Sequence, residues 1–361
     1  MSDKSIRFAL HGYGYIGRMH VLASQLSLAA NGGPTVLWDT AVVRDMQSNA
    51  AQQASTAFAH VTDRLADLHE RPLDAIDIAS PNDLHFAPFE LALEKGWAVY
   101  CEKPISHCLE EAERMVALAQ TRQMVEQVAL VYRFHPAVLE AQQWLLSGQL
   151  GRVLTFRGEL LHGGYLNPAR PMSWRLQKQA SGGGAVMDLG IHIIDLIHLL
   201  CGKVAHVAAE TRTFIPSRAG AAGMEAVDVD DWASITLHTE SGAVGTIEVS
   251  RVHYGEETDS LTIVCERGVL RLPLDMYQGV TLHTYEPNIA PITLDKNQHA
   301  DIFTAKFAQS TLLNLHATAL AAFCARVQGK TVPYAVPTLA DACVAQAVCE
   351  AALAAGSTKK Q

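Results

Sequence analysis

The N-terminal segment of this 361-residue chain carries a short apolar strand, a glycine-rich turn and a helix in direct succession. The strand covers residues 6–10, the turn reads Gly12-Tyr-Gly14-Tyr-Ile-Gly17, and the helix is predicted over residues 18–30. In such a unit the first glycine makes a tight turn, the second lets a diphosphate approach, and the third packs helix on strand. The diphosphate is expected at the helix N-terminus, which favours anions. The segment therefore predicts a dinucleotide site made of Gly12, Gly14, Tyr15, Ile16 and Gly17. The alternative is an ordinary glycine turn.

Apolar strands and helices alternate through the first third of the chain. Strands are predicted within residues 35–43, 74–79, 97–101 and 126–131, and helices over residues 47–58, 88–95 and 109–121. This alternation predicts a parallel, doubly wound sheet, which binds ligands at the carboxyl ends of its strands. Polar residues follow two of these strands, and we predict that they line the cofactor crevice: Ser80, Pro81, Asn82 and His85, then Glu102 and Lys103. A solvated loop residue is the alternative for Lys103.

The end of the second strand bears on the choice of cofactor. An acid there would bind the adenine ribose of NAD, whereas an arginine would accept the 2′-phosphate of NADP. The segment reads Ala41-Val-Val-Arg44-Asp45, so we assign Arg44 to this position and favour NADP over NAD. Asp39 and Asp45 are rival positions, and Arg44 could instead be a solvated surface residue.

A second glycine run, Gly182-Gly-Gly184, precedes a very apolar helix predicted over residues 185–200. Asp188, His192 and Asp195 share one stripe of this helix because their spacings are four and three. A polar stripe on a buried helix is costly unless it is paired or lines a wet cavity. It is therefore either a structural ion-pair stripe between two helices or a cleft wall that offers a carboxylate and an imidazole to a substrate.

The second part of the chain is richer in strands. They are predicted over residues 153–161, 204–213, 232–239, 243–252, 260–266 and 269–272, several of them joined by tight turns. This pattern predicts a largely antiparallel sheet, with the helix after Gly184 against one face. Helices over 301–328 and 339–355 are expected to return to the first domain. We predict a Rossmann domain over 1–131 and an α/β domain for substrate binding and oligomerisation over 132–361.

Composition narrows the class of protein. The 28 basic and 37 acidic residues give a net charge of −9, which argues against a general nucleic-acid binder. We find no signal peptide in MSDKSIRFALHG, and we expect no membrane span. Seven scattered cysteines without a CxxC pair suggest free thiols and a cytoplasmic protein. No further His/Cys cluster accompanies the stripe, so metal catalysis is not expected.

Three motifs together resemble the Gfo/Idh/MocA oxidoreductases, which include glucose–fructose oxidoreductase and inositol dehydrogenase. They are the glycine turn at 12–17, Glu102-Lys103-Pro104, and the segment from Gly182 to Asp195 with its D-x-x-x-H pattern. Tyr165-Leu-Asn-Pro168, Ser173-Trp174-Arg175 and Ala340-Asp341-Ala342 also resemble the family. The resemblance implies a dinucleotide domain, a C-terminal domain with an open sheet, and homodimers or homotetramers through that sheet. It also implies a catalytic set of Lys103, Asp188 and His192.

Oxidation of a carbinol needs a hydride acceptor and a base, and these residues supply the base. His192 is the best base because the unperturbed pKa of histidine lies near neutrality. Asp188 would orient the imidazole or bind a hydroxyl, and Lys103 would stabilise charge on the reacting oxygen. Substrate contacts are predicted for Tyr165, Trp174, Arg175, Asp188 and His192, although aromatic side chains here could also be core.

The leading hypothesis is an NAD(P)-dependent dehydrogenase or reductase of a sugar, inositol or related polyol. One alternative is a regulator on the same fold that senses a dinucleotide or sugar without turnover. Another is NAD-dependent glycoside cleavage without net redox change. The sequence does not name the substrate, the reaction direction or the oligomer.

Overall fold

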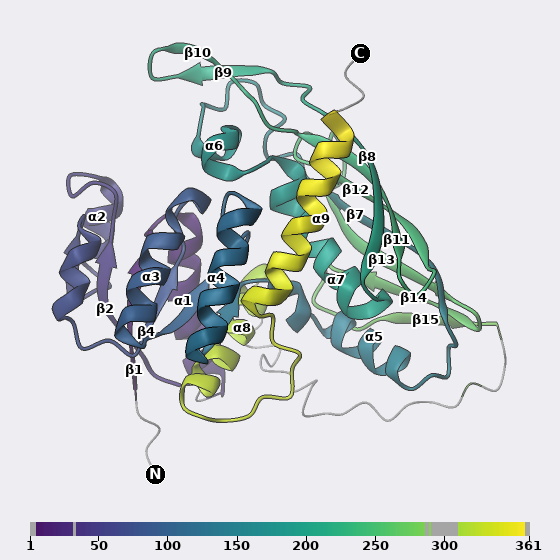
Figure 1. Ribbon diagram of the computed structural model, residues 1–361, viewed down its shortest axis with the longest axis horizontal. Helices are drawn as coiled ribbons and strands as arrows, with labels where there is room; N and C mark the ends of the chain where they lie inside the picture. The colour runs from purple at the N-terminus through teal and green to yellow at the C-terminus, as the bar shows by residue number, and fades with distance from the viewer. Residues whose placement is uncertain (1–4, 32–33, 286–288, 290–309, 358–361) are drawn as a thin grey trace. The chain divides into compact units, whose positions relative to one another are not determined.

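The computed structural model describes residues 5–31, 34–285, 289 and 310–357, and Figure 1 shows the course of the chain. The chain divides into two compact units. One comprises Met1–Phe134 and Ala300–Ala342, and the other comprises His135–His299 and Cys343–Gln361. The helix predicted over 301–328 is described only in part, because residues 301–309 lie outside the described ranges.

The first unit contains a six-stranded parallel sheet with strand order β3-β2-β1-β4-β5-β6. Its strands are β1 (Ile6–His11), β2 (Val36–Val42), β3 (His60–Thr62), β4 (Ala75–Ile78), β5 (Ala98–Cys101) and β6 (Glu126–Val128). Its helices are α1 (Tyr15–Asn31), α2 (Asn49–Ala54), α3 (Phe86–Lys95), α4 (Leu109–Arg122) and α8 (Thr311–Val327). The strand order changes direction between β1 and β4, which is the switch point where open α/β sheets bind ligands. The predicted doubly wound fold is confirmed.

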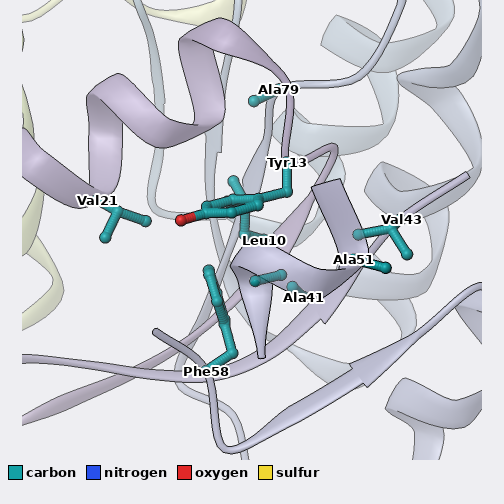
Figure 2. Packing of buried hydrophobic residues seen from close by; sticks show 9 residues of the cluster. Leu10, Tyr13, Val21, Ala41, Val43, Ala51, Phe58 and Ala79 are labelled. Carbon is teal, nitrogen blue, oxygen red and sulfur yellow. The ribbon is translucent and has the colours of Figure 1, made fainter. Parts of the chain in front are cut away.

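A hydrophobic cluster anchors the glycine turn to this sheet (Figure 2). Tyr13, between the first two glycines of the turn, belongs to the cluster and is only 9% exposed. Its ring meets Phe58 edge-on, with the ring centroids 5.3 Å apart. The other buried members are Leu10, Val21, Ala41, Val43, Ala51, Ala54 and Ala79. Because these side chains come from both strands and helices, the turn is packed against a rigid support.

The second unit contains a seven-stranded sheet with strand order β15-β14-β13-β7-β12-β11-β8. Its strands are β7 (Val153–Leu161), β8 (Val204–Arg212), β11 (Trp232–Thr239), β12 (Val244–Ser250), β13 (Thr258–Cys265), β14 (Gly268–Pro273) and β15 (Thr281–Thr284). Strands β9 (Ser217–Gly220) and β10 (Gly223–Ala226) form a separate hairpin. All neighbours in the large sheet are antiparallel except β7 and β12, which confirms the predicted, largely antiparallel sheet.

Helices also contribute to the part of the second unit that the structure describes. They are α5 (Pro136–Leu146), α6 (Lys178–Ser181), α7 (Ile191–Cys201) and α9 (Leu339–Ser357), of which α9 begins in the first unit. Helix α7 packs on the sheet, and a Cβ at Gly158 of β7 would lie 2.6 Å from the Ile193 side chain. Glycine at this position therefore lets the helix approach the strand closely.

The predicted continuous α-helix over 185–200 is wrong in one respect. A π-helical turn, Val186–Gly190, precedes α7, so Asp188 lies on the π-turn and His192 on the first turn of the α-helix. The wider π-turn changes how the two side chains face each other compared with a regular α-helix. Sequence periodicity assumes a constant number of residues per helical turn, so it cannot detect a π-helical turn.

Among the residues that the structure describes, two helical stretches, Lys178–Leu200 and Leu339–Gly356, are long and apolar enough to cross a membrane. In the first, 78% of the apolar window is buried, and in the second 50% is buried. Length and apolarity are weak evidence by themselves, because a buried core helix has the same composition. Packing of α7 on the sheet accounts for the first stretch.

Candidate active site

The glycine turn has the shape that a diphosphate requires. Gly12 has a φ of +104°, and a Cβ there would lie 2.6 Å from the backbone nitrogen of Ser80. A Cβ at Gly17 would lie 2.2 Å from the carbonyl oxygen of Gly12. A Cβ at Gly14, in contrast, would meet nothing within 4 Å. The turn thus fits a dinucleotide: two glycines are required by the protein itself, and the third leaves open space at the N-terminus of α1.

The loop after β4 adjoins this turn. Ser80 and Asn82 are largely buried, and the fully buried His85 lies behind them. Its Nε2 is 2.9 Å from the carbonyl oxygen of Ser80, and its Nδ1 is 3.3 Å from that of Ile105. Burial lowers the pKa of His85, and its bonds to these carbonyl oxygens oppose that change. His85 therefore braces two loops at the carboxyl edge of the sheet.

Lys103 lies at the same edge, directly after Glu102 and the end of β5. Strands β1, β4 and β5 are neighbours in the sheet, which gathers the glycine turn, the Ser80 loop and Lys103 along one edge. The backbone N–H of Lys103 donates to Oε2 of Glu102 at 3.1 Å, and the Lys103–Pro104 peptide is cis. The segments predicted to bind the cofactor, including the one with Arg44 after β2, thus follow strands that end at one edge of the parallel sheet.

Arg44 is exposed and lies two residues beyond the end of β2. Asp39 lies in the middle of β2 instead, where Arg71 binds its two carboxylate oxygens at 2.8 and 2.9 Å. Burial would raise the pKa of Asp39, but the bonds from Arg71 and Thr40 lower it. The Asp45 carboxylate accepts the backbone N–H of Gln47 at 2.8 Å. Asp39 is therefore already bonded to Arg71. Arg44 and Asp45 are the charged residues after the end of β2 that are candidates for contact with the adenine ribose.

In the second unit, one buried carboxylate holds the second glycine run. The backbone N–H groups of Gly184 and Val186 donate to Asp230 Oδ1 and Oδ2, each at 2.8 Å. A Cβ at Gly184 would lie 1.6 Å from the carbonyl oxygen of Asp230, so only glycine fits. Asp230 thus satisfies N–H groups that the start of a helix leaves open and fixes the π-turn that carries Asp188.

Arg251, just beyond β12, joins three parts of the predicted substrate site. Its Nη2 lies 3.0 Å from Oδ2 of Asp188, and its Nη1 donates to the carbonyl oxygen of Arg175 at 3.2 Å. Its guanidinium lies 5.1 Å from the ring centroid of Tyr165, whose N–H donates to the Arg251 carbonyl at 2.9 Å. Next to this group, the Arg175 guanidinium lies 4.4 Å from the centroid of the Trp174 ring. Tyr165, Trp174, Arg175 and Asp188 are therefore held as one cluster.

The remaining polar residues of the helix differ in exposure. The side chain of Asp188 is 29% exposed, whereas His192 is 9% and Asp195 only 1% exposed. Asp188 is thus the member of the stripe with an exposed part, whereas His192 and Asp195 are buried. Lys103 belongs to the first unit and the Asp188–His192 pair to the second.

Sequence reasoning missed both Arg251 and Asp230. The paired acids Asp230-Asp231 before a strand, and an arginine directly after one, were visible signals. Neither signal names its partner, because the bonded groups lie far apart in the chain; Gly184 and Asp230 are separated by 46 positions.

A doubly wound sheet whose glycine turn leaves room for a diphosphate defines a dinucleotide-binding protein. Residues 6–130 match the oxidoreductase-family model with an NAD-binding Rossmann fold, and residues 138–271 match the GFO/IDH/MocA C-terminal domain. The chain belongs to the Gfo/Idh/MocA family of oxidoreductases.

Named relatives agree with this assignment. Levoglucosan dehydrogenase of Pseudarthrobacter phenanthrenivorans is 30% identical over 275 residues, which cover 70% of this chain and 69% of the relative. Inositol 2-dehydrogenase 4 of Saccharopolyspora erythraea is 28% identical over 98% of this chain and 94% of the relative. A structure of levoglucosan dehydrogenase with NADH and L-sorbose has a TM-score of 0.86 at 25% identity, covering 98% of this chain and 97% of that one.

Proposed function

We propose that this protein oxidises a carbinol of a sugar, inositol or related polyol, or reduces the corresponding carbonyl. The observation that carries the proposal is the Arg251–Asp188 ion pair, which holds a carboxylate beside Tyr165, Arg175 and the His192 helix. Sugar hydroxyls are bound by such charged acceptors, and aromatic rings stack on sugar C–H faces. The named relatives act on substrates of this class.

The catalytic set is Lys103, Asp188 and His192. His192 removes the hydroxyl proton as general base, and Asp188 orients the imidazole or binds a neighbouring hydroxyl. Lys103 donates a hydrogen bond to the reacting oxygen and stabilises the charge that develops there. A bound nicotinamide supplies the hydride acceptor. Tyr165, Trp174 and Arg175 hold the sugar against these groups.

The cofactor is held by the glycine turn through Gly12, Gly14, Tyr15, Ile16 and Gly17. Ser80, Pro81, Asn82, Glu102 and Lys103 line the crevice, and His85 supports it from behind. We favour NADP over NAD because the exposed Arg44 at the end of β2 can pair with a 2′-phosphate through forked, charged hydrogen bonds. Asp39, the nearest acid on the strand, is already bound by Arg71.

The protein is further proposed to be cytoplasmic and to form homodimers or homotetramers through its C-terminal sheet, without nucleic-acid or membrane partners. One face of that sheet carries α7, and alternate residues on its strands are partly exposed, as on β11 and β12. A sedimentation-velocity experiment would show a dimer or tetramer, and a monomer at micromolar concentration would contradict this assembly.

A screen of levoglucosan, D-xylose and myo-inositol with NAD⁺ and NADP⁺ tests the function. We expect absorbance of the reduced nicotinamide to appear with at least one polyol. Consumption of a glycoside without net change in absorbance would instead favour redox-neutral cleavage. Dinucleotide binding without any turnover over a broad panel would favour the sensing regulator.

A further inference from the structure

A fully buried ionic cluster lies behind Lys103 within the first unit. His20 on α1 lies between Asp77 of β4 and Glu102 at the end of β5. Its Nδ1 is 2.9 Å from Asp77 Oδ2, and its Nε2 is 3.1 Å from Glu102 Oε1. The exposed fractions of the three side chains are 1%, 0% and 9%. Water therefore contributes little to this cluster, and its charges depend on one another.

Both ring nitrogens of His20 face a carboxylate oxygen at hydrogen-bond distance. A neutral imidazole has only one N–H, so donation to both carboxylates requires the imidazolium form. Burial alone would lower the pKa of His20, but Asp77 and Glu102 raise it to about 10. Burial likewise would raise the pKa of Glu102, and His20 lowers it to about 2. For Asp77, burial raises the pKa and the His20 charge opposes the rise.

Glu102 connects this imidazolium to Lys103. While Oε1 accepts from His20, Oε2 accepts the backbone N–H of Lys103 at 3.1 Å. The charge of Lys103 also contributes to the lowered pKa of Glu102. The charges of His20 and the half-buried Lys103 therefore offset those of the buried Asp77 and Glu102 carboxylates.

We propose that His20, held by Asp77, is a positioning residue that fixes the Glu102 carboxylate and, through it, the backbone at Lys103. This inference rests on the proposed role of Lys103 at the reacting oxygen. A misplaced Lys103 would lower the rate while leaving the dinucleotide bound, because the glycine turn holds the diphosphate. Because its side chain is only 1% exposed, His20 acts through Glu102 in this proposal.

A metal ion is the competing occupant of this cluster. His20, Glu102 and His316 each offer a ligand atom, and these atoms lie within 4.8 Å of one another. A metal between them would require a lone pair, not a proton, on the His20 nitrogen that faces Glu102. The 3.1 Å separation of that nitrogen from the carboxylate is a hydrogen-bond distance. The geometry therefore favours a proton at this point, and metal analysis is part of the test.

The first readout is ¹⁵N NMR of histidine-labelled protein at pH 8, where an unperturbed histidine is neutral. We expect His20 to be protonated on both nitrogens, with its signals assigned by their loss in His20→Gln. A neutral His20 at pH 8 would overturn the proposal. So would one equivalent of a divalent metal, retained by the wild type after dialysis and lost in His20→Gln.

The second readout is the amide N–H of Lys103, which we expect to shift in His20→Gln and in Glu102→Gln. The control is His135→Gln. His135 is also buried and bonded at both nitrogens, but its partners are the Ala137 N–H and the Met276 carbonyl. Burial lowers its pKa to about 4, so it is neutral. An unchanged Lys103 amide in either variant would overturn the proposal, so Glu102→Gln still tests it if His20→Gln does not fold.

The third readout is a double-mutant cycle with Lys103→Met, measured on protein shown to be folded by near-UV circular dichroism. We expect His20→Gln to lower kcat at least tenfold and to change the dinucleotide Kd less than threefold. In the Lys103→Met background it should lower kcat less than twofold, because coupled residues are not additive. Full additivity would overturn the proposal. If the wild type turns over no polyol, the proposed function fails, while the two NMR readouts still decide the His20–Glu102–Lys103 linkage.

Discussion

The guanidinium of Arg251 and the carboxylate of Asp188 form an ion pair at 3.0 Å, in which the arginine is 4% and the aspartate 29% exposed. Arg251 is fixed by a second bond, from its Nη1 to the Arg175 carbonyl. The side chain of Asp188 is partly exposed and can still contact a ligand. The Asp188 carboxylate is thereby held at a defined position on the π-turn, which a hydroxyl-binding group requires.

Arg251→Met is therefore expected to affect both stability and turnover. The loss of unfolding free energy should be about 1–3 kcal/mol, because the unpaired Asp188 carboxylate can still be partly hydrated. The kcat/KM should fall at least tenfold as Asp188 and the Tyr165 segment lose their common support. Arg251→Lys should recover part of the stability but not the bond to Arg175. Denaturant melts and steady-state kinetics check this, and an Arg251→Met enzyme with normal kcat/KM would contradict it.

Gly14→Val should abolish dinucleotide binding and leave the fold intact. A Cβ at Gly14 meets no protein atom within 4 Å, so the added side chain occupies only the space where the diphosphate is proposed to bind. Calorimetric titration with NAD⁺ and NADP⁺ measures the loss.

Gly17→Val is the matched control. Its Cβ would lie 2.2 Å from the Gly12 carbonyl oxygen, so this variant should lose stability as well as binding. Undiminished binding by Gly14→Val would remove the cofactor from this turn.

Arg44→Ala should weaken NADP and leave NAD nearly unchanged. A hydrogen bond to a charged group contributes about 1.5–3 kcal/mol, which corresponds to a roughly tenfold to hundredfold change in Kd. Fluorescence titration with NADPH and NADH gives both constants on one preparation. Equal losses for the two cofactors would show that Arg44 does not read the 2′-phosphate.

The buried His20 cluster predicts a specific pH dependence of stability. The pKa of His20 is raised to about 10, so its contribution is full below about pH 6.5, the unfolded value, and is lost as the pH rises towards 10. The pKa of Glu102 is lowered to about 2, so its contribution is full above about pH 4.5 and is lost as the pH falls towards 2. The stability advantage of the wild type over His20→Gln should therefore be largest between about pH 4.5 and 6.5.

Neighbouring titratable groups are present in both proteins, so comparing the wild type with His20→Gln removes most of their own contribution to the pH dependence. Burial lowers the pKa of His316, which packs on His20, to about 3, and burial raises the pKa of Tyr100 well above its usual value. Asp77 is the remaining acid at the ring, and it shares the His20 proton. Melting temperatures of both proteins from pH 4 to 10 test the expectation, and a difference that grows from pH 6.5 to 10 would contradict it.

Much of the fold could be predicted from local patterns. The roles of Gly12, Gly14 and Gly17 follow from their spacing after a strand, and the structure gives each the expected surroundings. Lys103 and Ser80 could be assigned to one crevice edge because parallel strands end together. These predictions could be made because each depends on residues near one another in sequence or on a rule of sheet topology.

The rest depends on contacts that sequence spacing does not encode. Arg251 meets Asp188, and Asp230 meets Gly184, only after distant segments of the second unit pack together. His20 follows the glycine turn within an apolar helix, so its partners Asp77 and Glu102 could not be named from the chain. The π-turn at Val186–Gly190 breaks the regular period on which the stripe of Asp188 and His192 was predicted.

The most direct test of the account is the turnover of His192→Ala, with Asp195→Ala as the control from the core side of the same helix. If His192 is the general base, kcat should fall by about a hundredfold or more, with dinucleotide affinity and melting temperature nearly unchanged. Lys103→Ala should also lose rate, whereas Asp195→Ala should lower the melting temperature and leave the folded fraction active. Rate and melting temperature are measured on the same preparations. A stable His192→Ala enzyme with wild-type kcat would contradict the central claim that this helix carries the catalytic base.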